Sequence, residues 1–145
     1  MKKFFIIICS TFLVATSFAY VPEVNERVLN SFKQTFTNAE SVKWEEYQSY
    51  YTVSFMHSGI QSKVNYDRKG NMLGSIRYYS AQMLPLNIFN KVKKDYAQQN
   101  LFGVTEVTFG NDVVYFVKIE TAKNWITVKM DATGSSEVYE KFKKG

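Results

Sequence analysis

The sequence contains a unit that recurs 64 residues further along the chain. The frame VNYDRKGNM, which begins at residue 64, returns as VKMDATGSS, which begins at residue 128. Between residues 51 and 71 the shift needs no gap, and it superposes identical residues: Tyr51 on Tyr115, Val53 on Val117, Val64 on Val128, Asp67 on Asp131 and Gly70 on Gly134. Self-similarity at a fixed period indicates a duplicated structural unit. We therefore predict two copies, over about residues 22–79 and 85–143.

Each copy is predicted to begin with a helix. The same shift superposes apolar residues four apart: Val24 on Ile88, Val28 on Val92 and Phe32 on Tyr96. This spacing is one stripe of an α-helix. The only two prolines, Pro22 and Pro85, precede the stripes, where proline suits a first helical turn. We expect helices over about 22–36 and 86–98.

Strands are predicted to follow each helix, because apolar residues then alternate, as in Tyr51, Val53 and Phe55. A one-residue slip also aligns Val42-x-Trp44 with Val107-x-Phe109. The expected strands lie near 41–46, 50–57, 60–67, 72–79, 104–109, 113–121, 124–131 and 136–142. Two helices and about eight short strands predict an α+β fold, with an antiparallel sheet and both helices on one face.

The recurring Asp-x-x-Gly is interpreted as a hairpin turn. The aspartate side chain accepts a backbone N–H two residues on, and the glycine takes the left-handed conformation. The turn residues are Asp67, Gly70, Asp131 and Gly134. A calcium loop would need alternating oxygen ligands and a downstream acid, which the neighbouring residues do not supply. We predict no metal site.

The first 19 residues are interpreted as a secretory signal peptide. Lys2 and Lys3 precede an apolar run, and Ser17-Phe18-Ala19 places small residues at the cleavage positions. Cleavage after Ala19 would leave one domain, residues 20–145, without cysteine and without a membrane-inserting segment. We therefore expect a periplasmic or secreted protein.

The charge pattern does not favour nucleic-acid binding. Loss of Lys2 and Lys3 lowers the net charge from +5 to +3. The remaining basic residues are mostly scattered, whereas a nucleic-acid site needs a concentrated basic face. Weak attraction to anionic cell-surface polymers remains an alternative.

The sequence has few residues in patterns typical of a catalytic site. After cleavage the chain has no cysteine, and its single histidine, His57, lacks partners at recognisable spacing. A glycosidase needs two carboxylates that face one another across a cleft, and nothing in the sequence places the acidic pairs Glu45-Glu46 and Glu137/Glu140 in this way. We predict a protein that is not an enzyme and holds no cofactor, with an envelope enzyme that uses His57 as the alternative.

The sheet face opposite the helices is the candidate binding surface. It is expected to hold aromatic and basic side chains of the types that anchor protein interfaces. The predicted residues are Tyr50, Leu73, Arg77, Tyr79, Phe116, Trp125 and Tyr139. Alternatively these aromatics stabilise the sheet by cross-strand pairing, or are covered by the segment near 80–84 or by a second copy of the chain.

The chain resembles the PepSY-like, β-lactamase-inhibitor-protein-like (BLIP-like) family of small exported bacterial proteins. The resemblance rests on the following features: Val42-Lys43-Trp44, Tyr51-x-Val53-x-Phe55, Val64-x-Tyr66-Asp67-x-x-Gly70 and Leu84-Pro85 before the second helix. It implies two tandem units that form one continuous curved sheet, with the helices on its convex side. It also implies a sheet face that clasps a partner enzyme, although this chain lacks the named inhibitor's disulfide cysteines.

These inferences predict a non-enzymatic exported binding module. Its partner would be a protein or peptide of the cell envelope, and inhibition or regulation of an envelope hydrolase or peptidase is the sharper hypothesis. A small-ligand or polyanion-binding envelope protein is the alternative, and homodimerisation through the same face remains open.

Overall fold

The computed structural model describes residues 22–145, so the predicted signal peptide lies outside the described residues. The first half contains α1 (Glu26–Thr35), β1 (Glu40–Glu46), β2 (Tyr50–His57), β3 (Ile60–Asp67) and β4 (Met72–Tyr79). A short 3₁₀-helix, η1 (Ala81–Met83), leads into the second half. That half contains α2 (Leu86–Asp95), β5 (Asn100–Phe109), β6 (Asp112–Glu120), β7 (Asn124–Asp131) and β8 (Ser136–Lys143).

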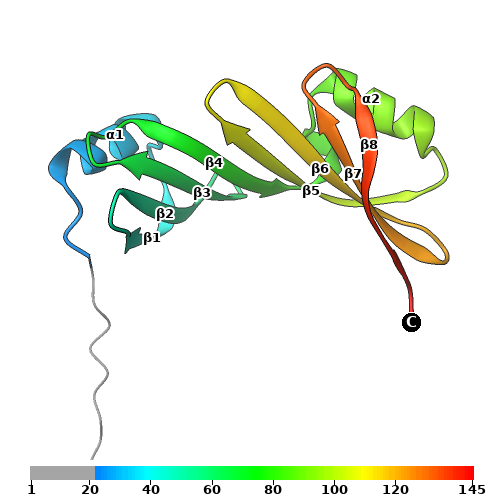
Figure 1. Cartoon of the computed structure of the whole chain (residues 1–145), viewed down its shortest axis with the longest axis horizontal. Coiled ribbons are helices and arrows are strands. Elements are labelled where there is room, and N and C mark those ends of the chain that lie inside the picture. The colour runs from blue at the N-terminus through cyan, green and yellow to red at the C-terminus, as the bar shows by residue number, and fades with distance from the viewer. Residues whose placement is uncertain (1–21) are drawn as a thin grey trace, which may run out of the picture.

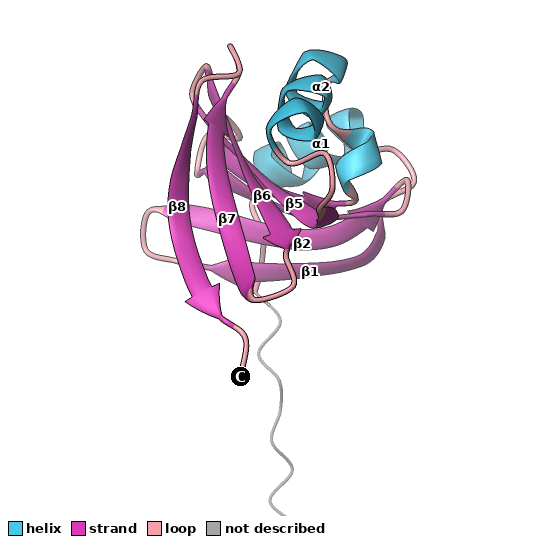
Figure 2. Cartoon of the chain, turned by 90° about the vertical axis from the view of Figure 1, so that its right-hand side faces the viewer, coloured by secondary structure: helices cyan, strands magenta, loops and turns pink. Residues whose placement is uncertain are grey.

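All eight strands form one antiparallel sheet in sequence order, β1 to β8. Figure 1 shows α1 beside the first four strands and α2 beside the last four, and Figure 2 shows both helices on the same side of the sheet. The predicted α+β class, with two helices on one face of an antiparallel sheet, is confirmed.

The core consists of two apolar clusters, one under each helix. Val28 and Phe32 of α1 pack with residues of β2 and β3, and Ile88 and Val92 of α2 pack with residues of β5, β6 and β7. All four helix side chains are buried. Isolated helices of ten residues are marginal in water, so each helix depends on burying its apolar stripe against its own half of the sheet.

The two helices are related by 60 residues, not by 64. Our alignment placed Val28 on Val92, whereas the structure gives Val28 and Ile88 equivalent positions. The caps show the same relationship: Asn25 and Pro85 precede the helices, and Phe36 and Tyr96 follow them. A shift of four residues keeps the same helix face toward the sheet. The apolar stripe therefore fits both alignments, and only the caps distinguish them.

The four-residue difference lies in the β5–β6 hairpin. Glu46 pairs with Tyr51 in the first copy, and Glu106 pairs with Tyr115 in the second. Residues 47–50 separate the first pair and residues 107–114 the second, so the second hairpin is longer and extends from the middle of the sheet (the yellow hairpin in Figure 1).

The alignment of Trp44 with Phe109 is wrong for the same reason. Trp44 pairs with Val53 and packs against the cluster beneath α1. Phe109 belongs to the hairpin extension, where it pairs with Asp112 and is 75% exposed.

Both Asp-x-x-Gly segments form hairpin turns. The Asp67 carboxylate accepts hydrogen bonds from the backbone N–H groups of Lys69 and Asn71 at 2.8 and 2.9 Å. The Asp131 carboxylate accepts two equivalent bonds from Thr133 and Ser135. Gly70 and Gly134 both have φ of +90°, a conformation that glycine adopts without steric cost.

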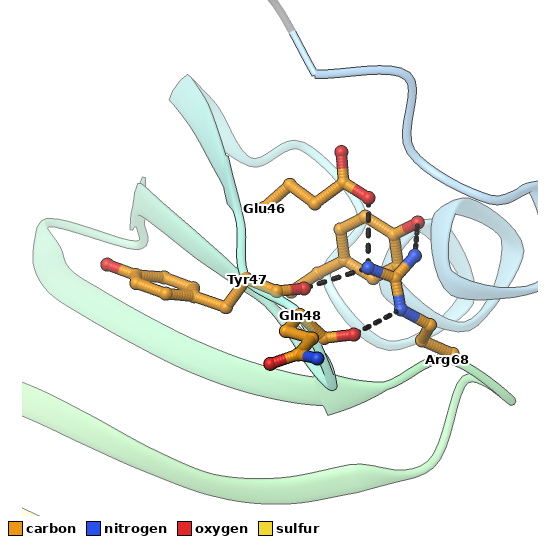
Figure 3. Close-up of polar contacts among 5 residues, drawn as sticks. Glu46, Tyr47, Gln48 and Arg68 are labelled. Atoms are coloured by element: carbon orange, nitrogen blue, oxygen red, sulfur yellow. Dashed lines mark hydrogen bonds and ion pairs between the residues drawn. The ribbon is translucent and has the colours of Figure 1, made fainter.

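Arg68 joins two turns of the first copy (Figure 3). Its guanidinium donates to the backbone oxygens of Tyr47 and Gln48 at 2.8 and 3.1 Å. It also donates to the Glu46 carboxylate at 3.0 Å and to the Tyr51 hydroxyl at 2.9 Å. The planar, multidentate guanidinium suits such a set of acceptors. The β3–β4 turn is therefore fastened to the β1–β2 turn.

Candidate functional site

We call the side of the sheet opposite the helices the open face. Five of the seven predicted binding residues lie on it: Tyr50, Leu73, Phe116, Trp125 and Tyr139. The structure divides them between the two halves. Tyr50 and Leu73 line one hollow of the first half, whereas Phe116, Trp125 and Tyr139 lie together on the second.

Arg77 and Tyr79 were placed on the wrong face. Arg77 pairs with Ser62, whose neighbours on the same side of β3 are core residues, and Tyr79 pairs with Val104 beneath α2. Both side chains therefore lie on the helix side of the sheet. They meet the carboxylate of Glu106 there, and so they belong to the junction between the two clusters.

A β-bulge in β4 causes this error. Tyr66 pairs with Met72 but Asn65 pairs with Gly74, so Leu73 is an extra residue. An extra residue reverses the alternation of side chains along the rest of the strand. Ile76 and Tyr78 consequently occupy the open face. The signal for this was Gly74, since a glycine inside a strand pattern often marks a bulge.

Bulges supply three exposed apolar side chains to the open face. Leu73 is the extra residue of β4, Phe102 of β5 and Tyr139 of β8. Their exposed fractions are 41%, 63% and 57%. Phe102 precedes a glycine as Leu73 does, and our strand prediction missed it because the strand was expected to begin at 104. Bulges commonly redirect side chains near functional sites.

Aromatic side chains on the second half of the open face contact one another in pairs. The rings of Phe102 and Trp125 meet edge to face with centroids 5.1 Å apart, and those of Phe116 and Tyr139 do so at 5.1 Å. Phe142, which sequence reasoning missed, pairs with Trp125 across β7 and β8 and is 57% exposed.

Two lysines lie over the Trp125 ring. The Lys118 and Lys144 Nζ atoms are 5.5 and 5.1 Å from its centroid, within the range of a cation–π contact. Lys144 also pairs with Glu120 at 2.7 Å. Hydrogen bonds from Lys144 and Asn100 lower the pKa of the Glu120 carboxyl below its usual value. Glu120 thus stays ionised beside the tryptophan.

Two hollows indent the open face. The first, of about 270 Å³, lies over β2 to β5, with Tyr50, Leu73, Ile76 and Phe109 in its lining and with Lys63 as its charged residue. The second, of about 360 Å³, lies over β4 to β7. It is lined by Tyr78, Phe102, Phe116, Thr127 and Lys118, among others.

A third, more polar hollow lies beside the other two, over β2 to β4. It is lined by Ser54, Gln61, Ser62, Lys63 and Tyr78. It shares Lys63 with the first hollow and Tyr78 with the second. The two apolar hollows adjoin on β4, where Ile76 of the first lies two residues from Tyr78 of the second, and the polar hollow lies to one side of them.

The segment near 80–84 does not cover these aromatics. Ala81 and Leu84 are 1% and 6% exposed and belong to the cluster beneath α2. The segment therefore packs on the helix side of the sheet, which overturns the alternative that it shields the open face.

The described residues show no arrangement for metal binding. Within residues 22–145 there is no group of three or more His, Cys, Asp or Glu side chains that could hold an ion. His57 lies at the end of β2, with its ring 5.7 Å from that of Phe36. Over the same residues, neither ten-residue helix reaches the length that a membrane crossing requires.

No protein-family model matches the chain, and a search of curated proteins gives no significant match. Solved structures do match its fold. A BLIP-like protein from Bacteroides fragilis aligns with a TM-score of 0.63 and 19% identity, over 87% of this chain and 91% of that chain. A DUF2874 family protein from Bacteroides ovatus aligns with a TM-score of 0.59 and 19% identity, over 81% of this chain and 85% of that chain.

A protein from Bacteroides eggerthii, described as a proposed periplasmic protein, aligns with a TM-score of 0.61 and 16% identity. The alignment covers 86% of this chain and 90% of that chain. At such low identity these likenesses show the fold and not the activity. The fold of the chain is BLIP-like, as its sequence resemblance implied, whereas the resemblance to PepSY modules stays a prediction.

Proposed function

We propose that the protein is a non-enzymatic binding module, exported to the periplasm or secreted, which holds a protein or peptide of the cell envelope on its open face. The observation that carries the proposal is the set of apolar side chains that the bulges direct into solvent: Leu73, Phe102 and Tyr139. An open sheet face is normally covered by polar side chains. Clustered exposed apolar groups are typical of interaction sites.

The composition of the face supports a protein partner. Aromatic residues are enriched at the centre of protein interfaces, and a few of them provide most of the binding free energy. Phe102, Phe116 and Trp125 lie within ring-contact distance of other aromatics, so they are held in place before a partner arrives. Such preorganisation reduces the entropy lost on binding.

Inhibition or regulation of an envelope hydrolase or peptidase is the sharper form of the proposal. It is supported by the BLIP-like name of the Bacteroides fragilis neighbour and by the location implied for the Bacteroides eggerthii protein. The open, two-hollow surface is suited to covering part of another protein rather than to enclosing a small substrate.

Binding of a small ligand or polyanion is the second candidate, favoured by Lys118 and Lys144 beside Trp125. Salt separates the two proposals. Polyanion binding weakens steeply with added salt because of screening, whereas an aromatic interface weakens little.

Affinity capture from an envelope extract tests the proposal, with residues 20–145 as bait. The test variant is Phe102→Ser/Tyr139→Ser, which alters two exposed side chains of the open face. The control is Met83→Ser/Leu86→Ser, which removes exposed apolar side chains at the end of η1 and the start of α2. We expect a protein retained by the wild type and the control but lost with the test variant. Equal retention by all three would contradict the proposal.

A further inference from the structure

We propose that the segment bound on the open face is acidic and apolar: an extended stretch of polypeptide with two apolar side chains, each next to a carboxylate. This inference rests on the proposed function and specifies the chemistry of the partner. It follows from what lines the hollows, from the charges that are left without a partner, and from the distance between them.

Each apolar hollow contains one lysine and no carboxylate. Lys63 is the only charged residue in the lining of the first hollow, and Lys118 is the only one in the second. The polar hollow beside them adds no further charge. An occupant of either hollow therefore meets a positive charge beside an apolar surface.

Neither lysine is neutralised within the part of the chain that the structure describes. Lys129 pairs with Glu137 and Lys144 with Glu120 on the same half of the sheet. Neither Lys63 nor Lys118 forms an ion pair with any described residue, although Lys118 makes a cation–π contact with Trp125. Both side chains are exposed. A carboxylate on a partner would complement each of them, because opposite charges at an interface fix the register and exclude wrong partners.

The register of the sheet gives the spacing that the partner must match. Lys63 lies in one row with Ile76, Val107 and Val114, which takes the row from β3 to β6. Lys118 lies on β6 beside Gly103, four residues beyond Val114. With about 4.8 Å between strands and about 3.3 Å per residue, the two lysines lie about 20 Å apart. An extended segment of about six residues covers this distance.

The presence of two separate lysines favours a peptide over a lipid. A fatty acid carries a single carboxylate and would pair with only one of the two lysines, whereas a peptide can present a carboxylate to each of them. Backbone amides and polar side chains of a peptide can also make hydrogen bonds to Ser54, Gln61 and Tyr78, which line the third hollow. A polyanion would in turn leave the apolar linings exposed to water.

Synthetic peptides test this inference. The probe is a fluorescein-labelled peptide that carries two Asp-Phe pairs about six residues apart, joined by Gly, Ser and Asn. One control peptide replaces both aspartates by lysine, and another replaces both phenylalanines by serine. Binding is measured by fluorescence anisotropy on residues 20–145, with the emission of Trp125 followed in a Trp44→Phe variant.

We expect the acidic peptide to bind on the order of tenfold more tightly than the lysine peptide, since each exposed ion pair contributes modestly. The Lys63→Glu/Lys118→Glu variant should reverse that preference. The Lys33→Glu/Lys93→Glu variant, with the same net charge but with its changes on the helices, should keep it. The serine peptide should bind weakly to every variant.

Three outcomes would overturn the inference: equal binding of acidic and basic peptides, an unchanged preference in Lys63→Glu/Lys118→Glu, or displacement of the peptide by oleate or heparin. The experiments distinguish failure of this inference from failure of the proposed function. If an envelope protein is captured through the open face while the peptides show no charge preference, the binding module stands and only the acidic-apolar partner is rejected.

Discussion

The Tyr79 hydroxyl donates a 2.5 Å hydrogen bond to the Glu106 carboxylate. Tyr79 is the last residue of β4, and Glu106 lies on β5, so this bond joins the first half of the sheet to the second. Arg77 completes the group with a 3.1 Å ion pair to the same carboxylate. Burial, together with the bond to Glu106, raises the pKa of Tyr79 well above its usual value.

Tyr79→Phe should therefore destabilise the protein by about 1–2 kcal/mol, because it leaves a largely buried carboxylate short of a donor. The neighbouring Tyr78→Phe is a matched control: Tyr78 lies on the open face and is 43% exposed. Urea unfolding of the two variants measures the difference. Equal losses of stability would show that the hydroxyl at the junction contributes nothing specific.

Gly74→Ala should destabilise the protein by about 1–3 kcal/mol. A Cβ atom at this position would lie 2.6 Å from the backbone oxygen of Thr108, so β4 and β5 would have to move apart. Gly103 occupies the corresponding place in the bulge of β5, but its added Cβ would lie 3.8 Å from the nearest atom, the Tyr79 oxygen. Gly103→Ala should leave thermal stability nearly unchanged, and a similar loss in both variants would contradict the role given to the close contact at Gly74.

Arg68→Lys should loosen the β1–β2 turn. A lysine ammonium cannot reach the two backbone oxygens, the carboxylate and the hydroxyl that the guanidinium of Arg68 contacts. Because the side chain of Arg68 is 44% exposed, the cost is about 1 kcal/mol. Hydrogen exchange should accelerate at Tyr47, whose amide bonds to Tyr50. Lys69→Ala is the control, and unchanged exchange in Arg68→Lys would refute the prediction.

The two Asp-x-x-Gly turns should make the protein sensitive to acid. Hydrogen bonds from Asn71 lower the pKa of Asp67, and those from Thr133 and Ser135 lower the pKa of Asp131, from an ordinary value of 3.8. Folding therefore releases protons from these groups. Their contribution to stability is complete above about pH 5 and is lost as the pH falls through the folded pKa values.

The variant Asp67→Asn/Asp131→Asn tests this prediction, because asparagine keeps an acceptor oxygen but does not titrate. The free energy of unfolding, measured between about pH 5 and pH 2, should fall less steeply for the variant than for the wild type. Identical slopes would mean that the two turn carboxylates do not contribute to acid unfolding.

The strands were predictable because apolar alternation and turn residues specify them locally. The bounds expected for β2, β3, β4 and β7 are those observed. The prediction was wrong about which face of the sheet some side chains occupy. The extra residue at Leu73 reversed the faces of Arg77 and Tyr79, and bulges depend on the geometry of neighbouring strands. The helix alignment failed because a four-residue shift preserves the apolar stripe.

The candidate site was predictable in kind but not in detail. Phe116 and Trp125 follow from alternation in β6 and β7. Phe102 and Phe109 do not: Phe102 is a bulge residue, and Phe109 lies in a hairpin extension that only the second copy has. The hollows form where these residues meet side chains of other strands. The register between paired strands, and not the local sequence of one strand, determines which side chains line each hollow.

Site-specific photo-crosslinking in cells tests whether the open face binds another polypeptide. A photoreactive phenylalanine analogue replaces Phe102 on the open face or, as a control, Leu86 at the start of α2, which is 73% exposed. We expect Phe102 alone to yield a covalent adduct with another envelope polypeptide in cells that produce the protein. Adducts from Leu86 but not from Phe102, or adducts of two copies of this chain only, would contradict it.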